Sequence, residues 1–148
     1  MAHGRIADKV DAGEKCMRCY TTGRISMFIG LHRHSHYSKR DAIATIPDMV
    51  NRIGRLGQTA WALTDHGTTS GLMDAYKTTK KYNKEHGTDI KFIFGMEAYW
   101  VPSYYIRDRA ASCHLILLAK NKTGYRNLLR LATIGYGDKG NSPDNFFY

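Results

Sequence analysis

The 148-residue chain has little cysteine and no long apolar run. Its three cysteines, Cys16, Cys19 and Cys113, are too few for a disulfide framework, which favours a reducing, cytoplasmic setting. A membrane-spanning helix needs about 20 consecutive, mostly apolar residues, and no such stretch exists, so no membrane partner is expected. Residues 1–26 also lack the apolar segment of a secretory signal. A cytoplasmic globular protein is the class that these absences favour.

Acidic residues are scarce as well. The chain has 13 Asp and Glu against 22 Lys and Arg, which gives a net charge of +9 and a pI near 9.6. This excess favours polyanionic partners, because each cation that approaches a phosphate releases counterions. DNA or nucleotide phosphate is therefore an expected partner, although a merely soluble basic surface explains the charge equally well.

Residues 1–26 show no helical or strand period. Cys16 and Cys19 could supply half of a zinc site, with His3 as a helper, but a structural zinc site needs four ligands. We expect a disordered leader or a non-native start here. A single domain is then expected over residues 27–148, and its apolar ending suggests a domain that is cut short.

The rest of the chain alternates strand and helix patterns. Strands are expected over residues 27–33, 60–64, 91–101 and 113–119. Helices are expected from a Thr45 cap to a stop at Gly57, from a Thr69 or Ser70 cap to about His86, and from a Thr123 cap through Ile134. This alternation predicts an α/β fold with mainly parallel strands. Because a closed α/β barrel takes about 250 residues, we expect part of a barrel or a small open sheet.

Histidine and glutamate recur at or near these strands. His32 and His34 share one face of the first strand, since they are two residues apart. His66 directly follows the second strand, Glu97 lies in the third and His114 in the fourth. Ligands gather at the carboxyl ends of parallel strands, so these side chains are expected to converge. A bare His-x-His is a weak signal, however, and His114 could equally be a core histidine.

Imidazole and carboxylate together favour zinc, manganese or iron. A cluster of such ions lowers the pKa of a bound water and polarises a phosphoryl oxygen, as phosphatases and nucleases require. The helix after Gly67 begins near Thr68 and Thr69, whose N–H groups and hydroxyls could hold an anion. An ordinary helix cap explains that stretch as well.

Four motifs now resemble one known family. They are Leu31-His-Arg-His-Ser-His-Tyr-Ser38 with Asp41, Ala62-Leu-Thr-Asp-His-Gly67, Phe94-Gly-Met-Glu-Ala-Tyr99, and the stretch from His114 to Leu129. In order and spacing they resemble the PHP (polymerase and histidinol phosphatase) domain of bacterial DNA polymerase III alpha subunits. The amino-acid sequences around His32 and Trp61 are most similar to those of phage-encoded subunits. The resemblance covers about residues 27–148.

The resemblance implies a distorted barrel of β/α units with two or three divalent metal ions, zinc, manganese or iron. The implied metal ligands are His32, His34, Asp41, His66, Glu97 and His114. His66 and Glu97 would be the catalytic residues, with Glu97 bridging metals, and Asp65 would orient its neighbour. The implied reaction is phosphoester hydrolysis of the 3′–5′ exonuclease type, and the implied partners are the remainder of the polymerase subunit and a proofreading exonuclease.

Some features depart from the family pattern. Arg33 replaces a small or apolar residue between the first two histidines, where its charge could repel a cation or hold a phosphate. The family's later ligands and its polymerase carboxylates would lie beyond Tyr148, so this chain is not expected to polymerise DNA. Two alternatives stay open: a non-catalytic scaffold that docks a proofreading exonuclease, and a free-standing phosphoesterase of the histidinol-phosphatase type.

Overall fold

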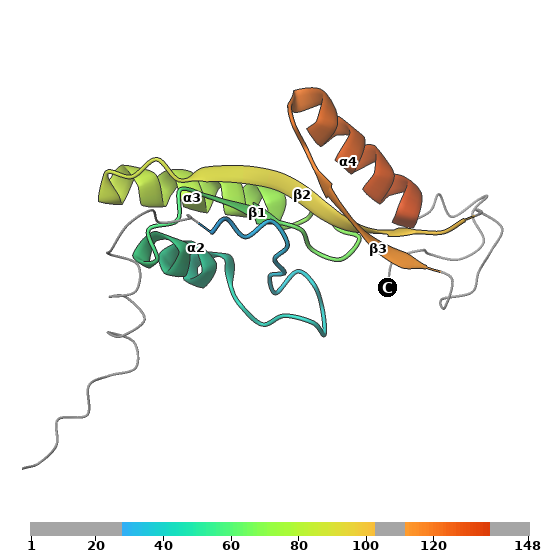
Figure 1. Ribbon diagram of the computed structural model, residues 1–148, viewed down its shortest axis with the longest axis horizontal. Helices are drawn as coiled ribbons and strands as arrows, with labels where there is room; N and C mark the ends of the chain where they lie inside the picture. The colour runs from blue at the N-terminus through green and yellow to red at the C-terminus, as the bar shows by residue number, and fades with distance from the viewer. Residues whose placement is uncertain (1–27, 103–111, 137–148) are drawn as a thin grey trace, which may run out of the picture.

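The computed structural model describes residues 28–102 and 112–136 as a mixed α/β fold. The elements follow the chain in the order α2 (Ile46–Arg55), β1 (Ala60–Leu63), α3 (Leu72–His86), β2 (Lys91–Trp100), β3 (Cys113–Leu118) and α4 (Lys122–Tyr136). Figure 1 shows α2 and α3 at one end of the fold and α4 at the other. The expected leader, with Cys16, Cys19 and Met27, lies outside the described residues.

The sheet of the described residues has three strands in the order β1-β2-β3. β1 runs parallel to β2, with Ala60 opposite Lys91 and Leu63 opposite Phe94. β3 runs antiparallel to β2, with Gly95 opposite Leu118, so the prediction of mainly parallel strands is wrong at this pair. A parallel pair needs a crossover connection of a dozen or more residues, usually a helix, and only residues 101–112 separate β2 from β3. β3 is also largely exposed and not buried as expected.

The strand expected over residues 27–33 is not a regular strand in its described part. An extended segment nevertheless lies along β1: Ala62 N donates to Gly30 O at 3.0 Å, and Thr64 N donates to Arg33 O at 2.9 Å. Arg33 N donates to the side-chain oxygen of Thr64 at 2.9 Å, where a ladder would offer a backbone carbonyl. This side-chain acceptor interrupts the ladder but keeps the segment beside β1.

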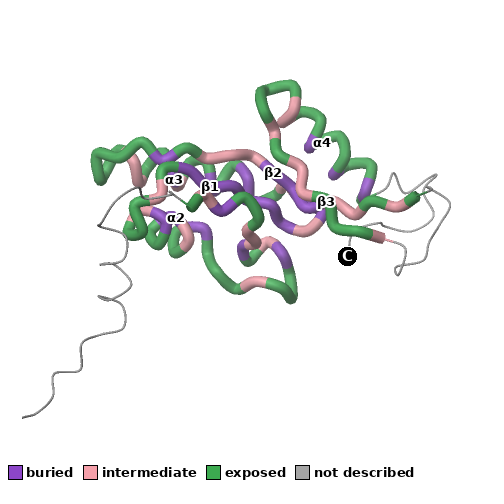
Figure 2. The backbone as a smooth tube through the Cα atoms, viewed as in Figure 1, coloured by how far each residue is buried: buried purple, intermediate pink, exposed green. Residues whose placement is uncertain are grey.

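The larger core joins α2, β1 and α3. β1 is buried along its whole length, as Figure 2 shows. Trp61 and Leu63 of β1 pack with Ile53 of α2 and Leu72 of α3, and the Trp61 indole N–H donates to the Thr79 hydroxyl at 3.2 Å. Met96, Leu128 and Ala132 form a second, smaller core between β2 and α4. β2 therefore belongs to both cores.

The helix boundaries are close to those expected, but two caps differ. Thr45 caps α2 by accepting from Asp48 N, as the sequence predicts. α3 has Gly71 at its cap position and no side-chain cap, so neither Thr69 nor Ser70 serves there, although Gly87 ends the helix at φ 63° as expected. At α4 the side chain of Asn121, and not that of Thr123, accepts from Gly124 N at 2.9 Å. None of the described helices is long and apolar enough to cross a membrane.

Gly95 stands where β2 changes partner from β1 to β3. A Cβ atom at this position would lie 2.7 Å from Thr64 Cγ2, 2.9 Å from Leu118 Cδ2 and 3.0 Å from the carbonyl oxygen of Leu117. Gly95→Ala is therefore expected to lower the free energy of unfolding by about 1–3 kcal/mol through overpacking, as measured by urea denaturation. Gly124→Ala is the control: its Cβ would lie 3.2 Å from Ala119 Cα, a close contact but a looser one than at Gly95, and alanine favours the helix. Equal stability of the two variants would contradict this account of β2.

Candidate metal centre

A buried carboxylate lies at the centre of four imidazoles. Glu97 is 0% exposed. Its Oε2 atom is 2.5 Å from His32 Nε2 and 3.1 Å from His34 Nε2. Its Oε1 atom is 3.0 Å from His66 Nδ1 and 2.6 Å from His114 Nδ1. Each carboxylate oxygen thus faces its own pair of imidazole nitrogens.

Backbone pairing places Glu97 beside His66. The two residues form an isolated parallel bridge just beyond the end of β1. Glu97 N donates to Asp65 O at 3.1 Å, and Gly67 N donates to Glu97 O at 2.8 Å. The carboxyl end of β1 is therefore fixed against the second half of β2, as parallel pairing predicts.

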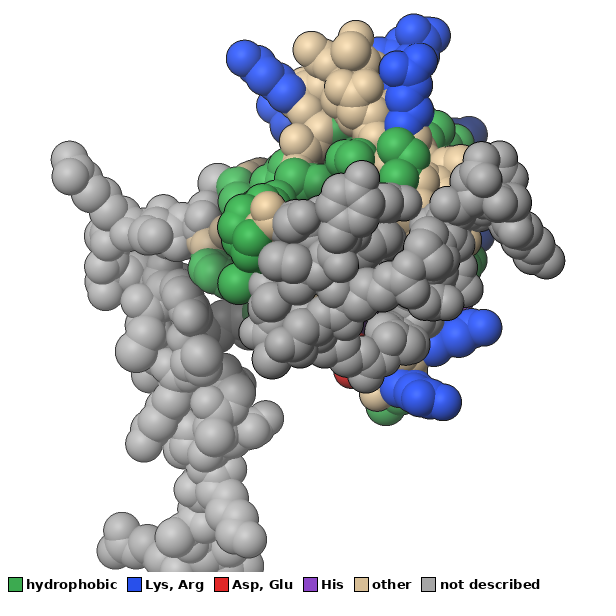
Figure 3. Space-filling model, turned by 90° about the vertical axis from the view of Figure 1, so that its right-hand side faces the viewer, with side chains coloured by type: hydrophobic (Ala, Val, Ile, Leu, Met, Phe, Trp, Pro, Cys, Tyr) green, Lys and Arg blue, Asp and Glu red, His purple; other side chains and the backbone are tan. Residues whose placement is uncertain are grey.

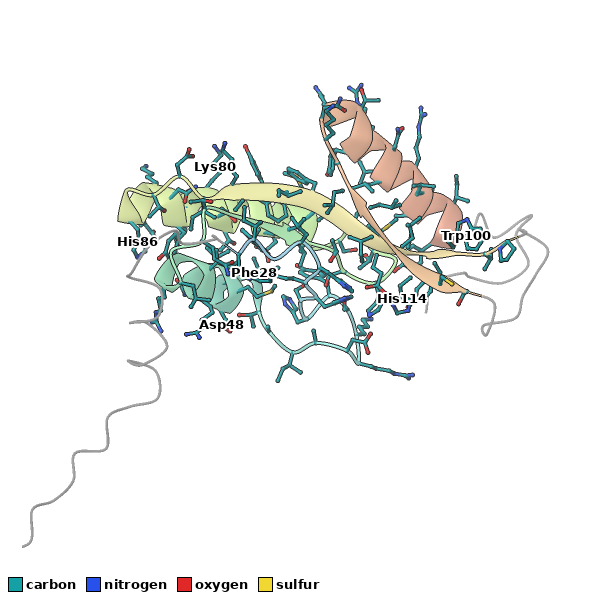
Figure 4. The ribbon with its side chains drawn as sticks, in the orientation of Figure 1. Phe28, Asp48, Lys80, His86, Trp100 and His114 are labelled. Carbon is teal, nitrogen blue, oxygen red and sulfur yellow. The ribbon has the colours of Figure 1, made fainter. Side chains whose placement is uncertain are left out.

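His114 reaches the cluster by a different route from the one expected. It lies near the start of β3, opposite Tyr99 of β2. Because β3 is antiparallel, its amino end lies beside the carboxyl end of β2, and this brings His114 to Glu97. Its side chain is 55% exposed, so it forms the rim of the cluster and is no core histidine. Figure 4 shows it at the opposite end of the fold from His86, which bonds to the Tyr82 carbonyl instead.

Asp65 anchors the segment that carries His32 and His34. Its buried carboxylate accepts hydrogen bonds from Ser35 N at 2.6 Å, Ser35 Oγ at 2.8 Å and Ser38 Oγ at 2.7 Å. The expectation that Asp65 orients its neighbours is consistent with these bonds. The serines of the first motif had no assigned role in the sequence, and the structure shows that they tie that motif to the end of β1.

Ser38 also determines which ring nitrogen of His34 carries the proton. The Ser38 hydroxyl hydrogen is used on Asp65, so its oxygen acts as an acceptor toward His66 N at 3.0 Å and His34 Nδ1 at 3.2 Å. His34 Nδ1 therefore carries the ring proton, and Nε2 presents its lone pair to Glu97. Burial lowers the pKa of His34, and the neighbouring His66 lowers it further. Both effects favour the neutral imidazole, which is the form that binds metal.

The donor set fits a divalent cation. Nε2 of His32 and Nε2 of His34 lie 2.8 Å apart, and Oε1 of Glu97 is buried without a hydrogen-bond partner among the described residues. His32, His34 and Glu97 each offer one ligand atom within 4.8 Å of the others. Converging lone pairs and a carboxylate oxygen without a bonded hydrogen are satisfied together by a cation.

Asp41 and Tyr99 complete the surroundings of His66. Asp41 Oδ2 contacts His66 Nε2, which brings the residue that was inferred only from the family resemblance into the cluster. The Tyr99 hydroxyl lies 3.1 Å from His66 Nδ1. Sequence reasoning missed Tyr99, although its position two residues after Glu97 on the same face of β2 was a usable signal.

Of the three expected phosphate-binding residues, Arg33 is turned away from the cluster, and in the described part of the chain Thr68 and Thr69 make local hydrogen bonds and none to the cluster. Arg33 points its guanidinium at the Gln58 side chain, with Nη2 donating to Oε1 at 2.7 Å, and burial lowers its pKa. In an extended segment, alternate residues point to opposite sides, so Arg33 faces away when His32 and His34 face Glu97. The hydroxyl of the buried Thr68 bonds to Ser70, and the Thr69 carbonyl accepts from Leu72 N.

A comparison with models of known protein families identifies the domain. The profile of the PHP domain matches residues 30–147. The chain therefore belongs to the PHP domain family, which confirms the resemblance of its motifs.

The sequence is similar to DNA polymerase III alpha subunits in particular. It is 42% identical to the alpha subunit of Borreliella burgdorferi over 116 residues, which is 75% of this chain and 10% of that protein. It is 41% identical to the alpha subunit of Chlamydia pneumoniae over 127 residues, 82% of this chain and 9% of that protein. The chain thus spans about a tenth of the length of these relatives.

Among solved structures, an amidohydrolase from Chromobacterium violaceum with bound sulfate and no metal is a more distant match. It has a TM-score of 0.48 and 24% identity, and the match covers 69% of this chain and 32% of that one.

Proposed function

We propose that this chain is the PHP-domain portion of a replicative DNA polymerase III alpha subunit and that the domain hydrolyses phosphoesters in the manner of a 3′–5′ exonuclease. The similarity to alpha subunits supports the polymerase context. The single observation that supports hydrolysis is Glu97, a fully buried carboxylate whose two oxygens face four imidazoles.

The proposed ligands divide into two groups around Glu97. His32 and His34 face Oε2, whereas His66 and His114 face Oε1. Glu97 would therefore be shared between ions. Because a neutral imidazole offers one lone pair, His66 would bind an ion either with Glu97 through Nδ1 or with Asp41 through Nε2. Two or three divalent ions, zinc, manganese or iron, would supply Lewis-acid activation of a phosphoester and of water.

The protein's own groups hold and orient this set. Asp65 and Ser38 keep the first motif against β1, and Ser38 leaves His34 Nε2 unprotonated. Tyr99 places a hydroxyl beside His66 Nδ1, where it can donate a hydrogen bond to a substrate oxygen. His66 and Glu97 are the catalytic residues of this proposal, and DNA or nucleotide phosphate is its substrate class.

Hydrolysis of a labelled oligonucleotide by a metal-loaded alpha subunit that contains this chain tests the proposal, because the family's later ligands would lie beyond Tyr148. The wild-type protein is expected to hydrolyse the strand with manganese, zinc or iron, and His32→Ala/His66→Ala is expected to lose the activity by roughly 100-fold or more, since ligands are lost on both sides of Glu97. His86→Ala is the matched control, because His86 is exposed and lies outside the cluster. Activity that survives in the double variant would refute the assigned site. Bound metal without any hydrolysis would instead favour a scaffold that docks a separate exonuclease.

A further inference from the structure

Asp41 lies on a turn beside the metal cluster. The carbonyl of Ser38 accepts from Asp41 N at 3.1 Å and from Ala42 N at 3.3 Å. The hydroxyl of Ser38 is bonded to the buried Asp65, so the base of the turn is fixed to the core. The carboxylate of Asp41 meets His66. Residues 39 and 40 therefore stand beside the cluster at the outer end of an anchored turn.

Arg40 holds an unfavourable backbone conformation at the tip of this turn. Its φ of 77° is the one positive value at a non-glycine position among residues 28–102 and 112–136. Glycine or asparagine adopts this region with less strain than arginine does. An outlier of this kind at a functional site is grounds for assigning a function to its side chain.

The cations of the turn have no partner within the described structure. Lys39 and Arg40 are both exposed, and no ion pair or hydrogen bond engages either side chain there. Arg33, the cation expected to hold a phosphate, is engaged with Gln58 instead. Figure 3 shows Lys and Arg side chains standing out in separate groups and not in one continuous patch. The turn is thus a local source of positive charge beside the carboxylate and imidazoles of the cluster.

We propose that Lys39 and Arg40 form an anion-binding arm that positions the phosphodiester backbone of a nucleic-acid strand at the metal cluster. The proposal rests on the function proposed above, to which it adds two positioning residues and a polymeric substrate. Successive side chains on an exposed turn point in different directions, so they can neutralise successive phosphates of a strand. A small phosphate ester would instead need donors that converge on it and exclude water, whereas both of these side chains are exposed.

Salt-dependent binding of a fluorescein-labelled oligothymidylate tests the arm. Titrations of the full chain in EDTA separate binding from hydrolysis. The variant Lys39→Gln/Arg40→Asn removes both charges, and asparagine tolerates the positive φ. Because this variant leaves two phosphates of the strand without a cation, the plot of log affinity against log salt is expected to become less steep by about 1.4, and affinity at about 50 mM salt to fall on the order of tenfold.

Lys77→Gln/Lys84→Gln is the matched control, because it removes the same charge from exposed positions on α3. An unchanged slope in the Lys39/Arg40 variant, or an equal change in the control, would overturn the proposal. Cleavage of the oligonucleotide is measured separately, with manganese present. If the Lys39/Arg40 variant shows the slope change but the wild-type protein cleaves nothing, the anion-binding arm is supported and the proposed hydrolysis is refuted. If the wild-type protein cleaves the strand but the variant's slope is unchanged, the proposed hydrolysis is supported and the arm is refuted.

Discussion

Glu97→Gln is expected to abolish tight binding of divalent ions. Among the described residues, this carboxylate is the one group that faces all four imidazoles, and an amide offers a single neutral oxygen in place of two charged ones. Loss of a residue that merely supports a ligand costs 10- to 100-fold in metal affinity, so loss of a bridging ligand is expected to cost roughly 100-fold or more.

Thermal unfolding and elemental analysis together measure the loss of metal binding in the Glu97→Gln variant. An ion present at 100 times its dissociation constant stabilises the fold by about 2.7 kcal/mol, which corresponds to a rise in Tm of roughly 5–10 °C for a domain of this size. The wild-type chain is expected to show this rise with manganese or zinc, and Glu97→Gln is expected to lack it. Glu85→Gln is the control, since Glu85 is exposed on α3 and contacts only Lys81, at 3.9 Å, among the described residues. An undiminished rise in the Glu97 variant would contradict the bridging role.

Asp65→Asn is expected to lower the free energy of unfolding by about 3 kcal/mol. The buried carboxylate accepts three hydrogen bonds, and each bond to a charged group contributes about 1.5–3 kcal/mol. The effects are less than additive, because all three donors belong to one segment. An asparagine keeps the size of the side chain but turns an –NH₂ donor toward hydroxyl or N–H donors, which leaves at least one of them without an acceptor.

Urea denaturation gives the stability change, and a metal titration gives a second readout. Because Asp65 holds Ser38 and through it His34, metal affinity is expected to fall 10- to 100-fold as well. Asp74→Asn is the matched control: within the part of the chain that the structure describes, this exposed residue accepts from Thr78 alone, at 3.3 Å, and its change is expected to stay within about 0.5 kcal/mol. If the two variants lost equal stability, Asp65 would not be the anchor of the first motif.

The sequence predicted the elements that carry strong local signals. The Thr45 cap, the apolar spacing of α2 and the glycine after His86 are local features, and the structure has all of them. The proximity of His32, His66 and Glu97 was also predictable, because strand ends at the same edge of a sheet meet. The resemblance to the PHP domain added Asp41, which no period or spacing could have singled out.

What the sequence could not predict depends on tertiary contacts. The antiparallel direction of β3 is set by its pairing with β2, and its apolar composition alone looks like a buried parallel strand. Arg33 donates to Gln58, which is 25 residues further along the chain. The Tyr99 hydroxyl lies beside His66, which is 33 residues away. Strand alternation indicates that Arg33 faces away from His32 and that Tyr99 shares a face with Glu97, but the partners themselves follow from the tertiary fold.

The change of partner along β2 has a consequence for the ions themselves. Up to Phe94 the strand is paired with β1; from Gly95 onward it is paired with β3, and the isolated Glu97–His66 bridge continues the contact on the β1 side. His32 and His34 reach Glu97 from the segment beside β1, whereas His114 reaches it from β3. If the edge strand β3 detached from β2, the Oε1 side of Glu97 would lose a donor and the Oε2 side would keep both of its own. If two ions are bound as proposed, their positions would then differ in affinity, and the position next to His114 would empty first.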